Sequence, residues 1–162
     1  MKYVILKVDT TGLNPDTAEI VKIDALKVID GETYHFVSFV NPGCLIPQEA
    51  SSVSGICNED VADAPTFEDI KESLLSFIGN LPIIGHNINF DLSFINKYLD
   101  VPLTNKSMSL MDMARNFGYT GSLKFTNMCK HYGILIDSKD IARTTNSLFQ
   151  VMLQDYRNRQ DN

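Results

Sequence analysis

The chain has no long apolar run, few cysteines and no excess of basic residues. No stretch of its 162 residues approaches the ~20 consecutive apolar residues of a membrane-spanning helix, so we expect no membrane association. The N-terminal apolar run, residues 3–6, is too short for the core of a signal peptide, and none is expected. The cysteines Cys44, Cys57 and Cys129 are odd in number and widely spaced. They are not typical of a disulfide framework or a zinc site and predict reduced thiols in a cytoplasm.

The net charge of −6 argues against a general nucleic-acid coat protein. The charge is unevenly divided along the chain. Residues 1–81 carry five Lys/Arg against thirteen Asp/Glu, a net charge of −8, whereas residues 82–162 carry nine against seven, a net charge of +2. A polyanion would therefore prefer the C-terminal half, although an ordinary solvated surface explains the same asymmetry.

Apolar residues make up 44% of the chain and are spread throughout it, which predicts one domain over residues 1–156 with a polar tail, residues 157–162, that frays. Three strand-like runs come first, with a hairpin signal at Asp30-Gly31 between the second and third. Strand and helix patterns then alternate, which predicts an α/β fold with a mixed central sheet and helices on its faces. The strands are expected at residues 3–9, 20–28, 34–40 and 81–84, with a fifth short strand or turn before Leu110. The helices are expected at 66–78, 88–99, 110–117, 122–132 and 142–156.

Several short motifs occur in a fixed order and at fixed distances. They are Asp9-Thr10-Thr11-Gly12, Asn41-Pro42-Gly43, Ser52-Val53-Ser54-Gly55-Ile56 and His86-Asn87-Ile88-Asn89-Phe90-Asp91. This series resembles the DEDDh-type 3'-5' exonucleases related to the proofreading (epsilon) subunit of bacterial DNA polymerase III. The resemblance implies a ribonuclease H-like architecture, Mg²⁺ or Mn²⁺ as cofactor, and the 3' end of a single-stranded nucleic acid or a nucleotide as ligand. It also implies a polymerase-type protein partner.

Hydrolysis of a phosphodiester by two metal ions requires carboxylates that converge from separate elements. In the family, a strand supplies two acids as Asp-x-Glu-Thr-Thr-Gly, and a third acid follows His-Asn-x-x-Phe. The last helix supplies the fourth acid and the general base, as His-x-Ala-x-x-Asp.

This chain departs from that pattern at several positions. Without a gap, Lys7 replaces the first acid and Asp9 the glutamate; a two-residue deletion would instead make Asp9 the first acid and remove the glutamate. Asp91 matches the third acid. On the last helix, Ala142 stands for the base and Ser147 for the fourth acid. Asp137 and Asp140 lie nearby, as solvated or capping residues or as replacements for the missing acid.

The remaining catalytic and metal-binding candidates are therefore Asp9 and Asp91, and Lys7 reduces their net charge to −1. At ~4 Å and an effective dielectric near 20, a divalent ion beside Lys7 would meet a repulsion of ~8 kcal/mol. Loss of a general base typically costs roughly 10²–10⁴ in rate. We expect the Lys7 ammonium to take the place of a metal and pair with both carboxylates; the alternative is that it extends to solvent at a sheet edge.

The resemblance implies that Thr10, Thr11, Gly12 and Leu13 hold the terminal nucleotide through backbone amides and an apolar wedge. It assigns Asn87 and Phe90 to the same binding site. A simple turn from strand to loop would explain residues 10–13 equally well. The sequence predicts a degenerate exonuclease that binds nucleic acid or a partner. A working exonuclease with a remodelled site, using Mg²⁺ or Mn²⁺, is the alternative. A purely structural subunit that needs no cofactor is a third interpretation.

Overall fold

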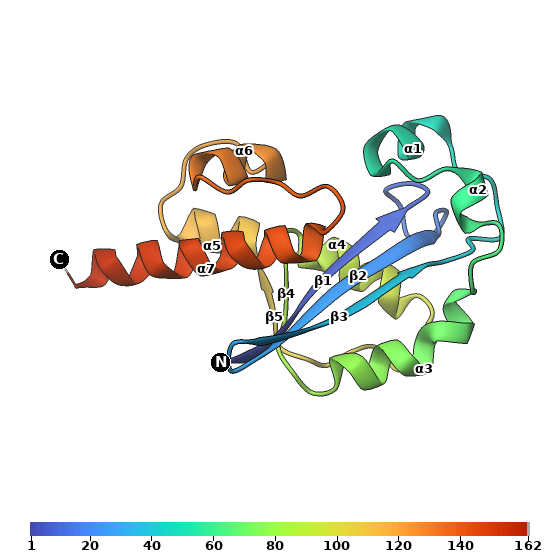
Figure 1. The fold of residues 1–162 in the computed structure, drawn as a ribbon, viewed down its shortest axis with the longest axis horizontal. Coiled ribbons are helices and arrows are strands. Elements are labelled where there is room, and N and C mark those ends of the chain that lie inside the picture. Colours follow the sequence, from blue (N-terminus) through green and yellow to red (C-terminus); the bar gives the residue numbers. More distant parts are fainter. Residues whose placement is uncertain (162) are drawn as a thin grey trace.

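The computed structural model describes residues 1–161, which form a five-stranded mixed sheet with helices on both faces (Figure 1). The sheet has the order β3-β2-β1-β4-β5. β2 pairs antiparallel with β1 and β3, whereas β4 runs parallel to β1 and β5. This confirms the predicted α/β fold class. The strands are β1 (Lys2–Thr10), β2 (Ile20–Ile29), β3 (Glu32–Phe39), β4 (Ile83–Gly85) and β5 (Ser107–Ser109).

The predicted hairpin joins β2 to β3. Asp30 and Gly31 have φ angles of 51° and 98°, and such a pair of positive values is what a tight two-residue hairpin turn requires. Gly31 meets this requirement without a steric cost, and Asp30 belongs to the few residue types that tolerate it.

Helices cover the two faces of the sheet as separate groups. α3 (Phe67–Ile78) and α4 (Ile88–Asn96) pack on one face, whereas α5 (Leu110–Asn116), α6 (Phe125–His131) and α7 (Ile141–Gln160) pack on the other (Figure 1). Two shorter helices, α1 (Gln48–Ser54) and α2 (Asn58–Val61), follow β3, and the sequence analysis did not predict them. Figure 1 shows α1 beside the C-terminal end of β1.

Alternation along β1 sends its side chains to two cores. Val4, Leu6 and Val8 join the cluster beneath α3 and α4, whereas Tyr3 and Ile5 join the cluster beneath α5, α6 and α7. Because side chains alternate with period two, Lys7 and Asp9 continue the row of Tyr3 and Ile5. The two charged residues therefore lie on the same face of the sheet as α7.

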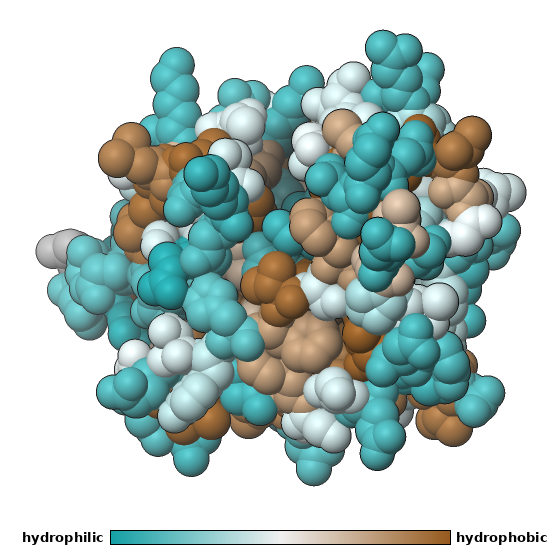
Figure 2. Space-filling model, turned by 45° about the vertical axis from the view of Figure 1, so that its right-hand side comes forward, coloured by the Kyte–Doolittle hydropathy of each residue, from teal (hydrophilic) through white to brown (hydrophobic). Residues whose placement is uncertain are grey.

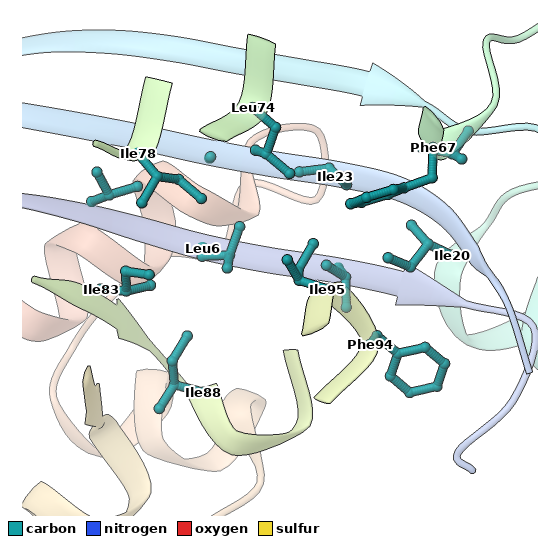
Figure 3. Packing of buried hydrophobic residues seen from close by; sticks show 14 of the residues in the cluster. Leu6, Ile20, Ile23, Phe67, Leu74, Ile78, Ile83, Ile88, Phe94 and Ile95 are labelled. Carbon is teal, nitrogen blue, oxygen red and sulfur yellow. The ribbon is translucent and has the colours of Figure 1, made fainter. Parts of the chain in front are cut away.

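The α3 helix follows its sequence pattern closely. The Thr66 hydroxyl accepts a hydrogen bond from the Asp69 amide, and the Asp69 carboxylate accepts one from the Thr66 amide, which completes a capping box. Figure 3 shows Leu74 and Ile78 from α3 near Ile23 of β2, and Ile88 and Ile95 from α4 on the side of Leu6 and Ile83. The predicted apolar stripe of α3 is thus confirmed.

The last helix is longer than its pattern suggested. α7 continues to Gln160, beyond the expected end at Tyr156, and an ion pair of 2.8 Å joins Arg159 to Asp155. Tyr156 also stacks on Phe117, the residue that follows α5, with ring centroids 4.2 Å apart. Val151 is 38% exposed, whereas Leu148 and Met152 are buried, because only one stripe of α7 faces the sheet. Tertiary contacts hold the polar end of the chain in the helix.

Within residues 1–161, no helix combines the length and apolarity that crossing a membrane requires. The face drawn in Figure 2 carries several separate apolar patches among hydrophilic side chains, rather than one continuous apolar surface.

Candidate functional site

The candidate site lies at the C-terminal end of β1, where charged side chains share one face of two strands. In the β1–β2 register, Lys7 is opposite Asp24, and Asp9 is opposite Lys22. Such directly opposed residues lie within reach of one another on one sheet face. Two positive and two negative side chains therefore alternate on the side that α7 covers.

Lys7 makes one of the two ion pairs predicted from the sequence, the one with Asp9. Its Nζ lies 2.9 Å from Asp9 Oδ1 and also donates to the Val8 carbonyl at 2.9 Å. Among the described residues, no ion pair joins Lys7 to Asp91, although the ammonium is close enough to lower the pKa of that carboxyl. The Lys7 side chain is thus fixed beside Asp9 and does not bridge both carboxylates.

Asp91 is held in a closely packed pocket at the start of α4. The carboxyl group is buried, with the residue 4% exposed, and its Oδ1 accepts the Val8 amide at 2.8 Å. Burial raises the pKa of Asp91 to about 7, against the opposing effects of the Val8 hydrogen bond and the Lys7 charge. Gly85 makes room for it: a Cβ there would lie 3.4 Å from Asp91 Oδ2 and 3.0 Å from the Leu6 carbonyl oxygen.

Asp24 is a site residue that the sequence analysis missed. It is 3% exposed, and its Oδ2 accepts the Ala142 amide at 3.1 Å, whereas its Oδ1 has no partner among the described residues. Burial raises the pKa of this carboxyl group. The available signal was an acid in the middle of an apolar strand, because a buried carboxylate is rare unless it is paired or functional.

The structure corrects the positions assigned on α7. Ser147 is exposed, and its hydroxyl donates to the Arg143 carbonyl within the helix, so it does not face the site. Ala142 is buried against Asp24, and Ile141 and Thr145 line the cavity instead. Successive helical residues rotate by about 100°, which places Ser147 on the other side of the helix from Thr145.

Two adjoining cavities surround these residues and share Lys7, Asp9, Val53, Ser54 and Phe90 as lining. The cavity between the β1 loop and α1 has a volume of about 440 Å³, and the cavity toward α7 about 420 Å³. Both lie within the size range of small-ligand sites. The first is also lined by Thr10, Thr11, Gly12 and Leu13, and the second by Asp24, His86, Asn87, Asp91 and Thr145.

The segment after β1 is shaped as a rim of the first cavity. Leu13 is 85% exposed, and Val53 on α1, another residue lining this cavity, is 90% exposed. The Thr11 amide donates to the Glu19 carbonyl at 2.8 Å, and the Thr10 hydroxyl donates to the Gly12 carbonyl at 2.6 Å. The Thr11 amide already donates its hydrogen bond within the protein. The expected backbone contact to a nucleotide therefore cannot come from Thr11.

His86 has a structural position beside the second cavity. Its carbonyl accepts the Met111 amide and the Ser109 hydroxyl, and its ring packs edge-on against Phe125 at a centroid distance of 5.2 Å. Burial lowers the pKa of His86, and the nearby Lys7 charge adds to this effect. The backbone carbonyl of His86 thus ties the turn before α4 to the start of α5, and the ring Nδ1 is buried without a hydrogen-bond partner among the described residues.

The five-stranded mixed sheet thus carries cavities lined by charged side chains at the end of its central strand, β1. The chain belongs to the exonuclease family (RNase_T), whose model matches residues 4–139. The resemblance to 3'-5' exonucleases and to ribonuclease H-like proteins is thereby confirmed.

Curated relatives include the epsilon subunit of DNA polymerase III from Rickettsia prowazekii (strain Madrid E). It is 33% identical over 148 residues, which cover 83% of this chain and 63% of the relative. The PolC-type DNA polymerase III of Clostridium perfringens (strain 13 / Type A) is 30% identical over 142 residues, which cover 85% of this chain and 10% of that protein. The chain thus spans less than two thirds of either relative.

Solved structures share the fold at lower identity. Exonuclease X in complex with 5' overhanging duplex DNA superposes with a TM-score of 0.73 at 21% identity, over 96% of this chain and 91% of that chain. Product-bound exonuclease I superposes with a TM-score of 0.78 at 15% identity, over 93% of this chain and 42% of that chain. These likenesses establish the common fold.

Proposed function

We propose that this protein is a degenerate 3'-5' exonuclease domain that binds the 3' end of a single-stranded nucleic acid, or a nucleotide, with little or no hydrolysis. The observation that carries the proposal is the Lys7–Asp9 ion pair of 2.9 Å at the end of β1. An ammonium group is fixed where the family pattern has a carboxylate, and it neutralises the neighbouring acid.

The geometry of α7 supports a revised register for the last family motif. With His-x-Ala-x-x-Asp placed on residues 140–145, the motif alanine coincides with Ala142. Asp140 then stands for the general base and Thr145 for the fourth acid. Thr145 lines the cavity, whereas Ser147 does not, so this register agrees with the helix geometry.

The residues present do not fit a pair of divalent cations. Asp9 is paired with Lys7, and Asp91 is buried, with one oxygen committed to the Val8 amide. Thr145 supplies a neutral hydroxyl that already donates to the Ile141 carbonyl. Hard divalent cations require several oxygen ligands with negative charge, and at the family's metal positions this chain offers only Asp9 and Asp91.

Nucleic-acid binding is supported by the first cavity rather than by the charged face. The exposed apolar side chains of Leu13 and Val53, with Phe90 of α4, offer a surface on which a base can pack. Asn87 is exposed on the wall of the second cavity and can donate hydrogen bonds to a phosphate or a base.

The alternative function is an active metal-dependent exonuclease with a remodelled site. Asp24 favours it, because it adds a buried carboxylate to the cavity that Asp9 and Asp91 already line. Such an enzyme would use Asp24 in place of the acid lost at position 7.

A nuclease assay on a 5'-labelled oligonucleotide with Mg²⁺ or Mn²⁺ separates the two functions. We expect no cleavage by the natural protein, and cleavage at least about 100-fold faster by a variant that combines Lys7→Asp, Asp9→Glu, Asp140→His and Thr145→Asp. Cleavage by the natural protein that Asp91→Ala abolishes would establish the remodelled enzyme. Cleavage that survives Asp91→Ala comes from a contaminant.

Binding is tested without divalent ions at low salt, where phosphate contacts are strongest. Fluorescence anisotropy of a labelled single-stranded oligonucleotide should give a saturable signal, and a free 3'-hydroxyl should be preferred to a blocked one. Absence of binding at low salt contradicts the nucleic-acid role. A polymerase-type protein partner and a cytoplasmic location remain predictions from the relatives, which are DNA polymerase III proteins.

A further inference from the structure

A second cluster of ligating side chains lies at the N-terminal end of α7, outside the family's metal positions. Asp24 of β2, His35 of β3 and Asp140 before α7 place one ligand atom each within 4.8 Å of one another. These residues come from three separate elements. Asp24 and His35 match no position of the family motif, and Asp140 stands at the position of its general base rather than at that of a metal ligand.

The buried member of this cluster has an unused oxygen. Asp24 is 3% exposed, and its Oδ2 is taken by the Ala142 amide, whereas Oδ1 has no hydrogen-bond partner among the described residues. A buried carboxylate oxygen without a partner is costly, because its hydration is lost without compensation. A cation bound at this position would supply the missing partner.

The Arg143 guanidinium contacts the other two members of the cluster, His35 and Asp140. Its Nη2 lies 2.8 Å from His35 Nε2, and its Nε lies 2.9 Å from Asp140 Oδ2. A guanidinium group can only donate hydrogen bonds, so in the tautomer that completes this contact His35 Nε2 is the acceptor and directs its lone pair at Arg143 Nη2, the position that a metal ion would take. An imidazole in this state is ready to bind a metal ion.

We propose that Asp24, His35 and Asp140 bind one transition-metal ion of the zinc class, which replaces the Arg143 guanidinium at this cluster. Each of the three residues offers one ligand atom, a carboxylate oxygen from Asp24 and from Asp140 and a ring nitrogen from His35. Asp140 Oδ1 keeps its hydrogen bond to the Arg143 amide at the start of α7. Arg143 is exposed, so its side chain can move into solvent without disturbing the core.

The chemistry of the three ligands selects the metal. Two carboxylates and one imidazole suit Zn²⁺, Co²⁺ or Mn²⁺, whereas Mg²⁺ prefers oxygen ligands alone. In a tetrahedral zinc site with bonds near 2.0 Å, ligand atoms lie about 3.3 Å apart. The cluster must therefore contract by roughly 1.5 Å at most from its present upper limit of 4.8 Å. Motion of exposed His35 and half-buried Asp140 can achieve this contraction.

Such an ion would join β2 and β3 to the start of α7. His35 lies on the edge strand of the sheet, and Asp140 caps the helix that carries Thr145. Asp24 also lines the second cavity, so the ion would be held at its margin. With three protein ligands, a position remains open for water or for a phosphate oxygen.

The test uses untagged protein in which Cys44→Ser and Cys57→Ser remove the two exposed thiols, since these would compete for zinc. Isothermal titration calorimetry with Zn²⁺, and visible absorption with Co²⁺, should give one bound ion per chain. His35→Ala and Asp24→Asn should each weaken binding at least about tenfold. Arg143→Ala should tighten it about tenfold, because the competing cation is removed.

Matched controls are His131→Ala and Asp112→Asn, which remove an exposed histidine and an exposed acid from other helices and should leave affinity within about twofold. His35 is exposed, so His35→Ala tests the ligand role without a change in the core. Circular dichroism melting checks that Asp24→Asn folds. Absence of binding overturns the proposal, as does binding that His35→Ala leaves intact or Mg²⁺ binding as tight as Zn²⁺ binding.

Discussion

The Lys7 ammonium and the Asp9 carboxylate form an ion pair of 2.9 Å at the end of the central strand. They are two residues apart on one strand, so both point to the same side of the sheet. The pair lies beside Asp91, whose pKa is lowered by Lys7 and raised more strongly by burial. Replacing one member of this group should therefore change both the stability of the fold and its affinity for cations.

Lys7→Met should destabilise the protein at pH 8 by about 1 kcal/mol, because Asp9 loses its partner at a partly exposed position. The same substitution should create weak Mn²⁺ binding, seen as a thermal midpoint that rises with Mn²⁺ concentration. Urea unfolding and thermal melting measure the two effects. Lys106→Met, on the exposed surface before β5, is the control and should show neither. An unchanged response to Mn²⁺ in Lys7→Met would show that Lys7 is not what excludes the metal.

Stability should fall as pH rises through the range in which Asp91 titrates. Its pKa is about 7 in the folded protein and 3.8 as the ordinary value, so between these values the folded state keeps a proton that the unfolded state has released. The loss of stability caused by ionisation of buried Asp91 is absent below pH 4 and complete above pH 7. Asp91→Asn removes this contribution, and its stability relative to the natural protein should rise by as much as about 4 kcal/mol from pH 4 to pH 8.

Urea unfolding of both proteins across this pH range provides the measurement. Taking the difference between them cancels the titration of other groups, including His86, whose lowered pKa acts in the opposite direction. A difference that stays constant with pH would contradict the raised pKa of Asp91.

Gly85→Ala should destabilise the protein by roughly 1–3 kcal/mol through overpacking. The added Cβ would lie 3.0 Å from the Leu6 carbonyl oxygen and 3.0 Å from Ile88 Cδ1. Ile88→Val removes the second contact but not the first, so the double variant should recover only part of the loss. Urea unfolding of the four proteins forms a double-mutant cycle. Full recovery in the double variant would show that the backbone contact is harmless.

Thr145→Asp and Ser147→Asp should differ in their effects on stability and on the response to Mn²⁺, because only position 145 lines the cavity. In a Lys7→Asp background, Thr145→Asp adds a buried charge and should lower stability by about 1–3 kcal/mol, with recovery on addition of Mn²⁺. Ser147→Asp should stay within about 0.5 kcal/mol and should not respond to Mn²⁺. Thermal melting with and without Mn²⁺ distinguishes them. The reverse result would restore Ser147 as the position of the lost acid.

Leu13→Ser should reduce the affinity for a single-stranded oligonucleotide about five- to tenfold without lowering stability, because Leu13 is 85% exposed. Leu135→Ser is the matched control, since Leu135 is 94% exposed and is not among the lining residues of the first cavity. Fluorescence anisotropy measures both. Equal affinities in the two variants would show that the rim of this cavity does not contact the nucleic acid.

The order of elements and the family could be predicted from sequence because both rest on local patterns. The apolar stripe of α3, the Asp30-Gly31 turn and the motif around Asp91 each carry their signal within a few residues. The register of the family motif on α7 was harder to predict, because this chain lacks the histidine and the aspartate that would align the motif. A shift of two residues rotates a position by about 200° around a helix, so Ser147 and Thr145 lie on opposite sides of α7.

Sequence alone determined the strands, the helices α3 to α7, and the replacement of a carboxylate by lysine at the end of the first strand, since these follow from periodicity and from the identity of single residues. Only the tertiary structure decided which side chains share the site. Asp24 and His35 lie on paired strands and meet Asp140 only after the chain has folded. Contacts between residues more than a hundred positions apart depend on strand register and helix rotation, and neither has a signature in a short stretch of sequence.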